Sequence, residues 1–251
     1  MFSVGAGVGR ITINRPGKSN ALNPEVFAQL GRILKEAAED SRVRVITLTG
    51  AGEKVFCAGV DLRAPLAAES RSEAFCRSDY RQLLLDIVEC PKPTVALARG
   101  HVMAGGLGMV LASDLCLACD DVYFSTPEIQ VGLFPMMVMG LLYRNVGRKK
   151  ATEMMFLGEK IPAPRAQELG IINHAYGRDQ FEAAADEFVG KLATKSSKIL
   201  KMGKAAIFRI LDETLPSEEK FLEAALGEVM ATDDSKEGIR AFVERRPPRW
   251  S

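Results

Sequence analysis

The sequence predicts a layered α/β protein with a helical C-terminal section. Strand-like and helical segments alternate over the first part of the chain, and long helical patterns dominate after about Met136. The 251 residues, 47% hydrophobic and 26% charged, are enough to bury a sizeable core in one main domain. We therefore expect a core over residues 1–190, and a helical region with a tail over residues 191–251.

The first expected elements are a strand, a helix and a second strand. Residues 9–14 alternate apolar and polar side chains before a Pro-Gly turn, which favours a strand. Residues 24–40 carry apolar side chains at helical spacing, with Asn23 as the cap and Pro24 at the first helical position. Residues 43–49 are rich in β-branched side chains. A strand, helix and strand in this order predict a parallel pair.

The same alternation continues along the chain. Further expected elements are a helix over 72–89, a strand over 94–98, a short helix over 105–112, strands over 115–118 and 122–125, and helices over 180–193, 198–211 and 217–230. The last residues combine three arginines with Pro247 and Pro248, which favours a surface arm over a helix.

Charge and segment composition exclude several classes of protein. The 33 basic and 32 acidic residues leave a formal charge of +1, so global attraction to nucleic acid or to an anionic membrane is not expected. The first residues lack a signal-peptide pattern, and no run approaches the ~18 apolar residues of a membrane span. We expect a cytoplasmic protein with no membrane partner.

The five cysteines are expected to be reduced and to fill the core. Cys116 and Cys119 form a C-x-x-C pattern, but the pair lies in an apolar run and has neither a second pair nor a histidine cluster nearby. His101 and His174 are the two histidines, and they belong to unrelated segments. No metal site is expected.

Two short loops of small residues follow expected strands, over residues 56–62 and 100–108. Small residues let a backbone approach a ligand closely, and amides at a helix start lack an internal acceptor. Such a pair of loops could bind one oxygen anion. For either loop taken by itself, a tight turn is the favoured interpretation.

These loops resemble two motifs of the crotonase superfamily, the enoyl-CoA hydratase/isomerase family. Residues 56–62 are similar to F-x-A-G-x-D-L, and residues 92–106 to K-P-x-x-A-x-x-G-x-x-x-G-G. Further matches, in order along the chain, are residues 14–16, 20–23, 126–129, 132–135 and 237–245. The resemblance covers nearly the whole chain. It implies a crotonase-like spiral of ββα units with a helical C-terminal trimerisation region, assembled as a homotrimer or a dimer of trimers.

The resemblance also implies the catalytic groups. The backbone N–H groups of Ala58 and Gly105 would form an oxyanion hole for the thioester carbonyl of an acyl-CoA, and Glu128 would be the general acid and base. Coenzyme A would enter only as part of the substrate, with no separate cofactor. The positions implied to bind acyl-CoA are Lys18, Ala21, Ala58, Asp61, Leu62, Gly105, Gly106, Pro135, Phe242 and Arg245.

Two places depart from the family pattern. Gly108 stands where true hydratases carry a second catalytic glutamate, and a hydration shared between two carboxylates needs that group. A single glutamate can still move one proton between two carbons, as in the family's isomerases, so we expect enoyl-CoA isomerisation or weak hydration. Residues 136–139 also replace a glycine-rich turn, either as an adaptable acyl pocket or as core.

Other functions remain compatible with the same fold. A non-catalytic acyl-CoA-binding or RNA-binding scaffold is one, with a local basic patch at Arg144, Arg148, Lys149 and Lys150. A thioesterase or decarboxylase is another. Its distinguishing pocket residues cannot be located from the sequence.

Overall fold

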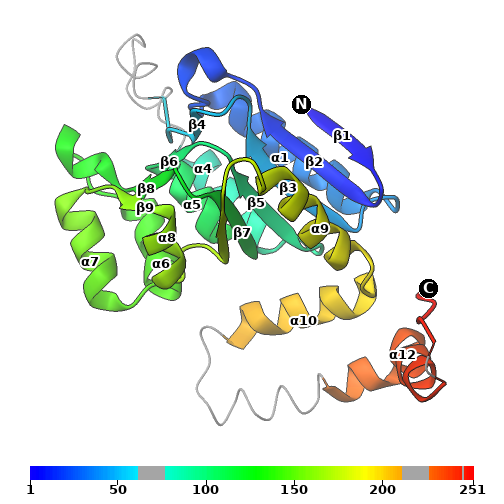
Figure 1. Ribbon diagram of the computed structural model, residues 1–251. Helices are drawn as coiled ribbons and strands as arrows, with labels where there is room; N and C mark the ends of the chain where they lie inside the picture. The colour runs from blue at the N-terminus through cyan, green and yellow to red at the C-terminus, as the bar shows by residue number, and fades with distance from the viewer. Residues whose placement is uncertain (62–76, 211–225, 245) are drawn as a thin grey trace.

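The protein folds as two sheets packed between helices, with a pair of helices extending away from them (Figure 1). The structure, a computed structural model, describes residues 1–61, 77–210, 226–244 and 246–251. Of the expected helices, the start of 72–89 and most of 217–230 lie outside these residues. Among the described residues, no helix is long and apolar enough to cross a membrane.

The larger sheet has six strands in the order β1-β2-β3-β5-β7-β10. Its strands are β1 Phe2–Gly5, β2 Val8–Ile13, β3 Val45–Gly50, β5 Thr94–Ala98, β7 Leu115–Cys119 and β10 His174–Tyr176. All neighbours are parallel except β1 and β2. The β1–β2 hairpin turns through Ala6 and Gly7, both at positive φ (52° and 77°), as a tight turn matched to strand twist requires.

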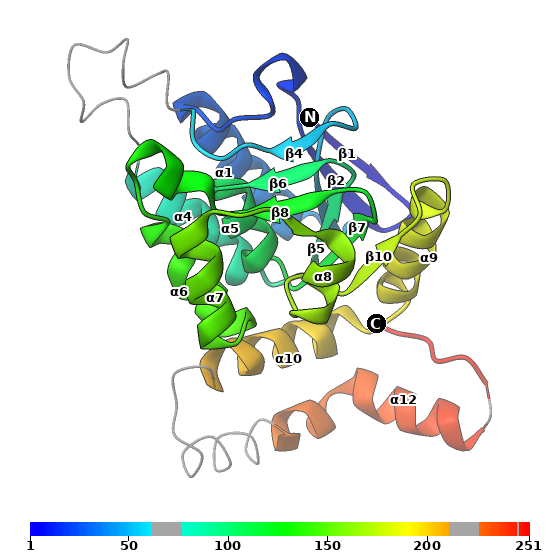
Figure 2. The ribbon, with the colours of Figure 1, turned by 60° about the vertical axis from the view of Figure 1, so that its left-hand side comes forward.

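The smaller sheet has four strands in the order β4-β6-β8-β9, which lie across the larger sheet in Figure 2. They are β4 Val55–Cys57, β6 His101–Met103, β8 Tyr123–Ser125 and β9 Ile161–Pro162. The chain thus sends β3, β5 and β7 to one sheet and the strand that follows each of them to the other. The expected spiral of ββα units is confirmed.

Helices surround the sheets and complete the core. They are α1 Pro24–Glu39, α4 Arg77–Val88, α5 Gly105–Ala112, α6 Met136–Asn145, α7 Arg148–Leu157, α8 Ala163–Glu168 and α9 Phe181–Ala193, with 3-10 turns η1 Pro16–Lys18 and η2 Pro127–Val131. The Asn23 side chain accepts the Val26 amide hydrogen and caps α1, as the sequence predicts. All eight residues of α5 are buried, because this helix lies between β4, α4 and α6.

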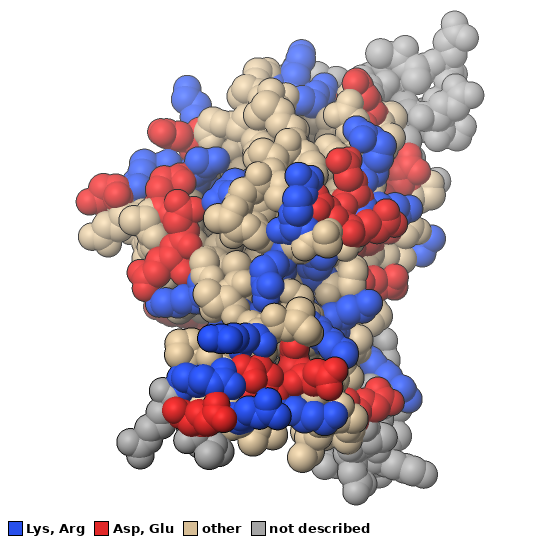
Figure 3. All heavy atoms as spheres, turned by 90° about the vertical axis from the view of Figure 1, so that its right-hand side faces the viewer, with Lys and Arg blue, Asp and Glu red and all other residues tan. Residues whose placement is uncertain are grey.

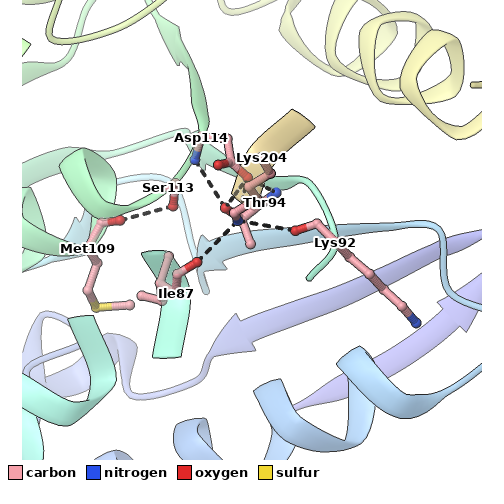
Figure 4. A network of polar contacts seen from close by, with 7 residues as sticks. All are labelled: Ile87, Lys92, Thr94, Met109, Ser113, Asp114 and Lys204. Atoms are coloured by element: carbon pink, nitrogen blue, oxygen red, sulfur yellow. Dashed lines mark hydrogen bonds and ion pairs between the residues drawn. The ribbon is translucent and has the colours of Figure 1, made fainter. Parts of the chain in front are cut away.

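The C-terminal region consists of α10 Ser197–Ile210 and α12 Asp233–Val243 among the described residues. A partly buried polar network joins α10 to the core (Figure 4). Lys204 Nζ lies 2.7 Å from a carboxylate oxygen of Asp114 and 3.3 Å from the carbonyl oxygens of Ile87 and Lys92. The same Asp114 oxygen accepts the Thr94 amide and hydroxyl. The boundary expected at residue 190 falls inside α9, and that division of the chain stays a prediction.

Candidate active site

The two small-residue loops meet backbone to backbone. Gly59 has a φ of +85°, and a Cβ atom there would lie 2.7 Å from the Gly105 nitrogen. In the other direction, a Cβ on Gly105 would lie 3.3 Å from the Gly59 Cα. Only glycine at residue 59 leaves the Gly105 amide uncovered, which explains physically why a glycine stands there. The loops that the sequence singled out do converge on one place.

The amides of the first loop are not equivalent. Ala58 N–H donates to the Ser19 carbonyl at 3.1 Å, and Gly59 N–H points to the Cys57 sulfur at 3.4 Å. Within the described part of the chain, the Val60 amide has no acceptor. Gly105 is the first residue of α5, so its N–H has no acceptor inside the helix. A ligand oxygen at Ala58 would therefore compete with Ser19, whereas Val60 and Gly105 have no such competitor.

The loop from Ser19 to Leu22 is held by one buried amide side chain. Asn20 is 1% exposed; its side-chain oxygen accepts the Arg15 amide, and its nitrogen donates to the carbonyls of Ala51 and Val55. Asn20 sits at a φ of 52°, a region that asparagine tolerates better than most residues. Sequence reasoning noted Asn20 only as part of a motif and missed this positioning role.

The turn into α5 is conformationally strained. Ala104 has φ 50° and ψ −126°, a region that is costly for a residue with a side chain and that occurs mostly at functional sites. Its amide donates to the Ser125 carbonyl at 3.0 Å, which ties the turn to β8. The strained residue directly precedes Gly105, so the strain orients that amide.

Glu128 lies at the second position of η2, directly after Pro127 and β8. Its Oε2 atom is buried and has no hydrogen-bond partner among the described residues. Burial raises the pKa of the Glu128 carboxyl, and a backbone hydrogen bond opposes that shift. A buried carboxylate oxygen without a donor is costly, and such a group with a perturbed pKa in a native fold is typical of an active site.

Tyr80 of α4 connects these groups, and sequence reasoning missed it. The side chain is 4% exposed, and its hydroxyl donates to the Gly105 carbonyl at 2.8 Å. Burial, together with the charges of Cys57 and Glu128, raises the pKa of Tyr80 well above its ordinary value. The Tyr80 hydroxyl thus contacts the Gly105 carbonyl and lies within range of the charge of Glu128. Inside an amphipathic helix a lone tyrosine gives no signal that distinguishes it from core.

The remaining residues implied to bind substrate occupy varied surroundings. Lys18 is exposed at the end of η1, and the Ala21 carbonyl accepts a hydrogen bond from Arg15 at 2.5 Å. Asp61 lies 3.5 Å from Arg15 as an ion pair. Their roles stay predictions.

Other implied residues are buried or lie outside the described structure. A Cβ on Gly106 would lie 2.3 Å from the Cys57 carbonyl oxygen, so this glycine permits close contact between α5 and β4. Pro135 is buried at the start of α6. Leu62 and Arg245 lie outside the described residues, as does the side chain of Phe242. The helix of Phe242, α12, lies beyond α10 from the sheets in Figures 1 and 2.

The described cysteines are free and buried, as the sequence predicts for core residues. Burial raises the pKa of the Cys57 thiol to about 12 and also raises that of Cys116. Thiols that stay protonated are poor nucleophiles and poor metal ligands. Cys76 lies outside the described residues.

Comparison with known proteins identifies the family of this chain. The family model described as Enoyl-CoA hydratase/isomerase matches residues 3–251. The (E)-benzylidenesuccinyl-CoA hydratase of Thauera aromatica is 32% identical over 247 residues, which cover 97% of this chain and 95% of that protein. The short-chain-enoyl-CoA hydratase of Clostridium acetobutylicum is 30% identical over 241 residues, 94% of this chain and 91% of that protein.

A solved structure extends the similarity to three dimensions. The enoyl-CoA hydratase of Mycobacterium smegmatis superposes with a TM-score of 0.93 and 32% identity, covering 100% of this chain and 98% of that one. Sequence similarity of this extent, a whole-chain family match and a shared fold lead to the same assignment. This chain belongs to the enoyl-CoA hydratase/isomerase family of the crotonase superfamily.

Proposed function

We propose that this chain binds an acyl-CoA thioester and moves protons on its acyl chain, with Glu128 as acid and base. The observation that carries the proposal is the buried Glu128 Oε2 atom, which has no hydrogen-bond partner among the described residues. A substrate C–H group beside this atom would face a base that makes no hydrogen bond to another described residue. Coenzyme A enters only as part of the substrate, and the chemistry requires no separate cofactor.

The thioester carbonyl would be bound by two backbone amides. Gly105 N–H is one, as the sequence predicts, and the start of α5 adds the positive end of a helix dipole. For the other we propose Val60 in place of Ala58, because Ser19 already accepts the Ala58 amide hydrogen. Removing a proton beside a thioester creates an enolate, and fixed donors stabilise the charge that develops on its oxygen.

The reaction that suits one carboxylate is isomerisation. Glu128 would take a proton from the α-carbon of a 3-enoyl thioester and return it to the γ-carbon, while the double bond moves into conjugation. Hydration would also need a group to activate water, and Gly108 has no side chain to do so. We therefore propose isomerisation, with hydration weak.

The rest of the ligand would follow the family pattern. Lys18, Ala21, Asp61 and Leu62 would contact the coenzyme A portion, and Pro135 the acyl side, while Phe242 and Arg245 would reach a neighbouring subunit's ligand. Such contacts require an assembly, which we propose to be a homotrimer or a dimer of trimers. Exposed Ile207, Phe208 and Ile239 on the C-terminal helices support an interface there.

The decisive experiment measures turnover of 2-enoyl-CoA and 3-enoyl-CoA by wild type and by Glu128→Gln. We expect 3-enoyl-CoA to be isomerised faster than 2-enoyl-CoA is hydrated, and the variant to lose about 10²–10⁴ in rate, the range of general acid–base catalysis. Binding of a saturated acyl-CoA should persist in the variant. Full activity of Glu128→Gln would contradict the proposal, as would the absence of both acyl-CoA binding and turnover in wild type.

A further inference from the structure

Tyr80 and Gly108 share one volume inside the site. A Cβ atom built on Gly108 would lie 2.0 Å from the Tyr80 hydroxyl oxygen and 3.2 Å from the ring carbon that carries it. The first distance is far below any real contact between such atoms. The hydroxyl therefore occupies the position where a side chain at residue 108 would begin.

The hydroxyl is held there from several sides. Its hydrogen bond to the Gly105 carbonyl fixes the oxygen, and the ring packs at a centroid distance of 6.0 Å from Phe27 of α1. Val138 of α6 borders the same volume, since one of its methyl groups would lie 3.3 Å from a Cβ on Gly108. Phe27 of α1 and Gly105 of α5 thus contact the tyrosine of a third helix, α4, and the oxygen can withdraw only by giving up these contacts.

The hydroxyl is also a neutral group. Its burial disfavours the phenolate, and so does the nearby negative charge of Glu128. A tyrosine that stays protonated can donate or accept a hydrogen bond but cannot take a proton from water as a carboxylate can. The site therefore contains a neutral oxygen at the place from which a second carboxylate would project.

We propose that Tyr80 is the specificity-determining residue of this site: by filling the Gly108 volume with a neutral hydroxyl, it restricts the site to proton transfer by Glu128. The inference rests on the proposed function. In the permitted reaction, Glu128 takes the α-proton and returns it to the γ-carbon, so no atom is added. In the disfavoured reaction, a water oxygen bonds to the β-carbon and a proton is added to the α-carbon, which requires a base for that water.

The same geometry explains why glutamate cannot simply be restored at residue 108. Its Cβ would collide with the Tyr80 oxygen before its carboxylate reached the site. A gain of hydration therefore requires both positions to change, and Gly108→Glu by itself is expected to damage the fold.

The first test measures thermal unfolding of Gly108→Ala, Tyr80→Phe and the double variant, without substrate. Alanine in place of a helical glycine normally stabilises, so Gly190→Ala, with no atom near its Cβ position, should raise Tm slightly. Gly108→Ala should instead lower Tm by roughly 5 °C or more. Tyr80→Phe should recover much of that loss in the double variant, because the colliding oxygen is gone. Gly108→Ala as stable as Gly190→Ala would overturn the proposal.

The second test measures the ratio of hydration to isomerisation for wild type, Tyr80→Ala, Tyr80→Ala/Gly108→Glu and the control Tyr176→Phe. A ratio taken on one preparation is independent of the fraction that folds, so a purely structural defect leaves it unchanged. We expect Tyr80→Ala/Gly108→Glu to raise the ratio at least about tenfold, within the range of a positioned acid or base. Tyr176→Phe should equal wild type.

The outcomes separate this inference from the proposed function. If the double variant folds and binds a saturated acyl-CoA but keeps the wild-type ratio, the role of Tyr80 is overturned while the acyl-CoA enzyme stands. If wild type neither binds nor turns over acyl-CoA, the proposed function fails first, and the specificity claim fails with it. The thermal unfolding of the Gly108 and Tyr80 variants would then still report whether the Tyr80 hydroxyl and a side chain at residue 108 compete for the same space.

Discussion

Helix α5, which starts at the site, and the helices at the C-terminus differ sharply in burial. Every residue of α5 is buried, whereas α10 has no buried residue and exposes Ile207 at 63%. Figure 2 shows α10 and α12 lying beyond the two sheets. The site region thus completes its core within one chain, and the C-terminal helices leave apolar side chains for another surface to cover. Proton transfer should depend on the first region, and assembly on the second.

The largest effect should come from the contact between the two loops. Gly59→Ala would place a methyl group 2.7 Å from the Gly105 nitrogen and strain the backbone at a φ of +85°. Losing one oxyanion donor costs on the order of 10²–10³ in rate, so kcat/KM should fall by at least that factor. Gly52→Ala is the matched control, because its φ is +79° and the nearest atom is 3.8 Å away. Equal activity of the two variants would show that Gly59 is not part of the site.

The pH profile should report the burial of Glu128. The base acts as a carboxylate, so kcat/KM should fall about tenfold per pH unit below its pKa. Because burial raises that pKa, the acid limb should lie above the ~4.3 of an ordinary glutamate. Replacing exposed Glu159 with glutamine should leave the limb unchanged. An acid limb at the ordinary value would place Glu128 in open solvent.

The raised pKa of Glu128 also has a consequence for stability. A carboxyl whose folded pKa is raised favours folding most when protonated, and this contribution is lost as the pH rises through the folded pKa. Glu128→Gln is therefore expected to be more stable than wild type at pH 7, with a Tm higher by about 2–4 °C. A lower Tm for this variant would show that a hydrogen-bond donor or a cation stabilises the Glu128 carboxylate.

The next effect tests the connection between the two regions. Lys204→Met removes three hydrogen bonds to Asp114, Ile87 and Lys92 from a side chain that is 12% exposed, and should cost about 2 kcal/mol in denaturant unfolding. Lys236→Met, whose ion pair is exposed, should cost less than ~0.5 kcal/mol. Similar losses for both would mean that the network in Figure 4 does not join α10 to the core.

The substitution with the smallest expected effect on catalysis is the one with the clearest expected effect on assembly. Ile207→Lys puts a charge on the exposed apolar face of α10, and should lower the mass measured by light scattering while kcat stays within about twofold of wild type. Lys201→Glu, on the same helix, changes charge without removing an apolar side chain and should keep the wild-type mass. An unchanged mass for Ile207→Lys would remove α10 from the interface.

The regular elements were largely predictable from local pattern. The expected strand over 94–98 and the helix over 105–112 match β5 and α5. Strands β1, β4, β6, β9 and β10 were missed, because segments of two to four residues carry too few apolar side chains for a period to show.

The sequence by itself determined the family and the two loops, and it predicted a role for Glu128 and a missing carboxylate at Gly108, because each is a local motif of residue types. The tertiary structure decided which amides of the first loop are already occupied, since the Ser19 carbonyl reaches Ala58 only when the chain is folded. It also decided what fills the space at Gly108. Tyr80 lies 28 positions earlier on another helix, and only the contact of α4 with α5 brings its hydroxyl there.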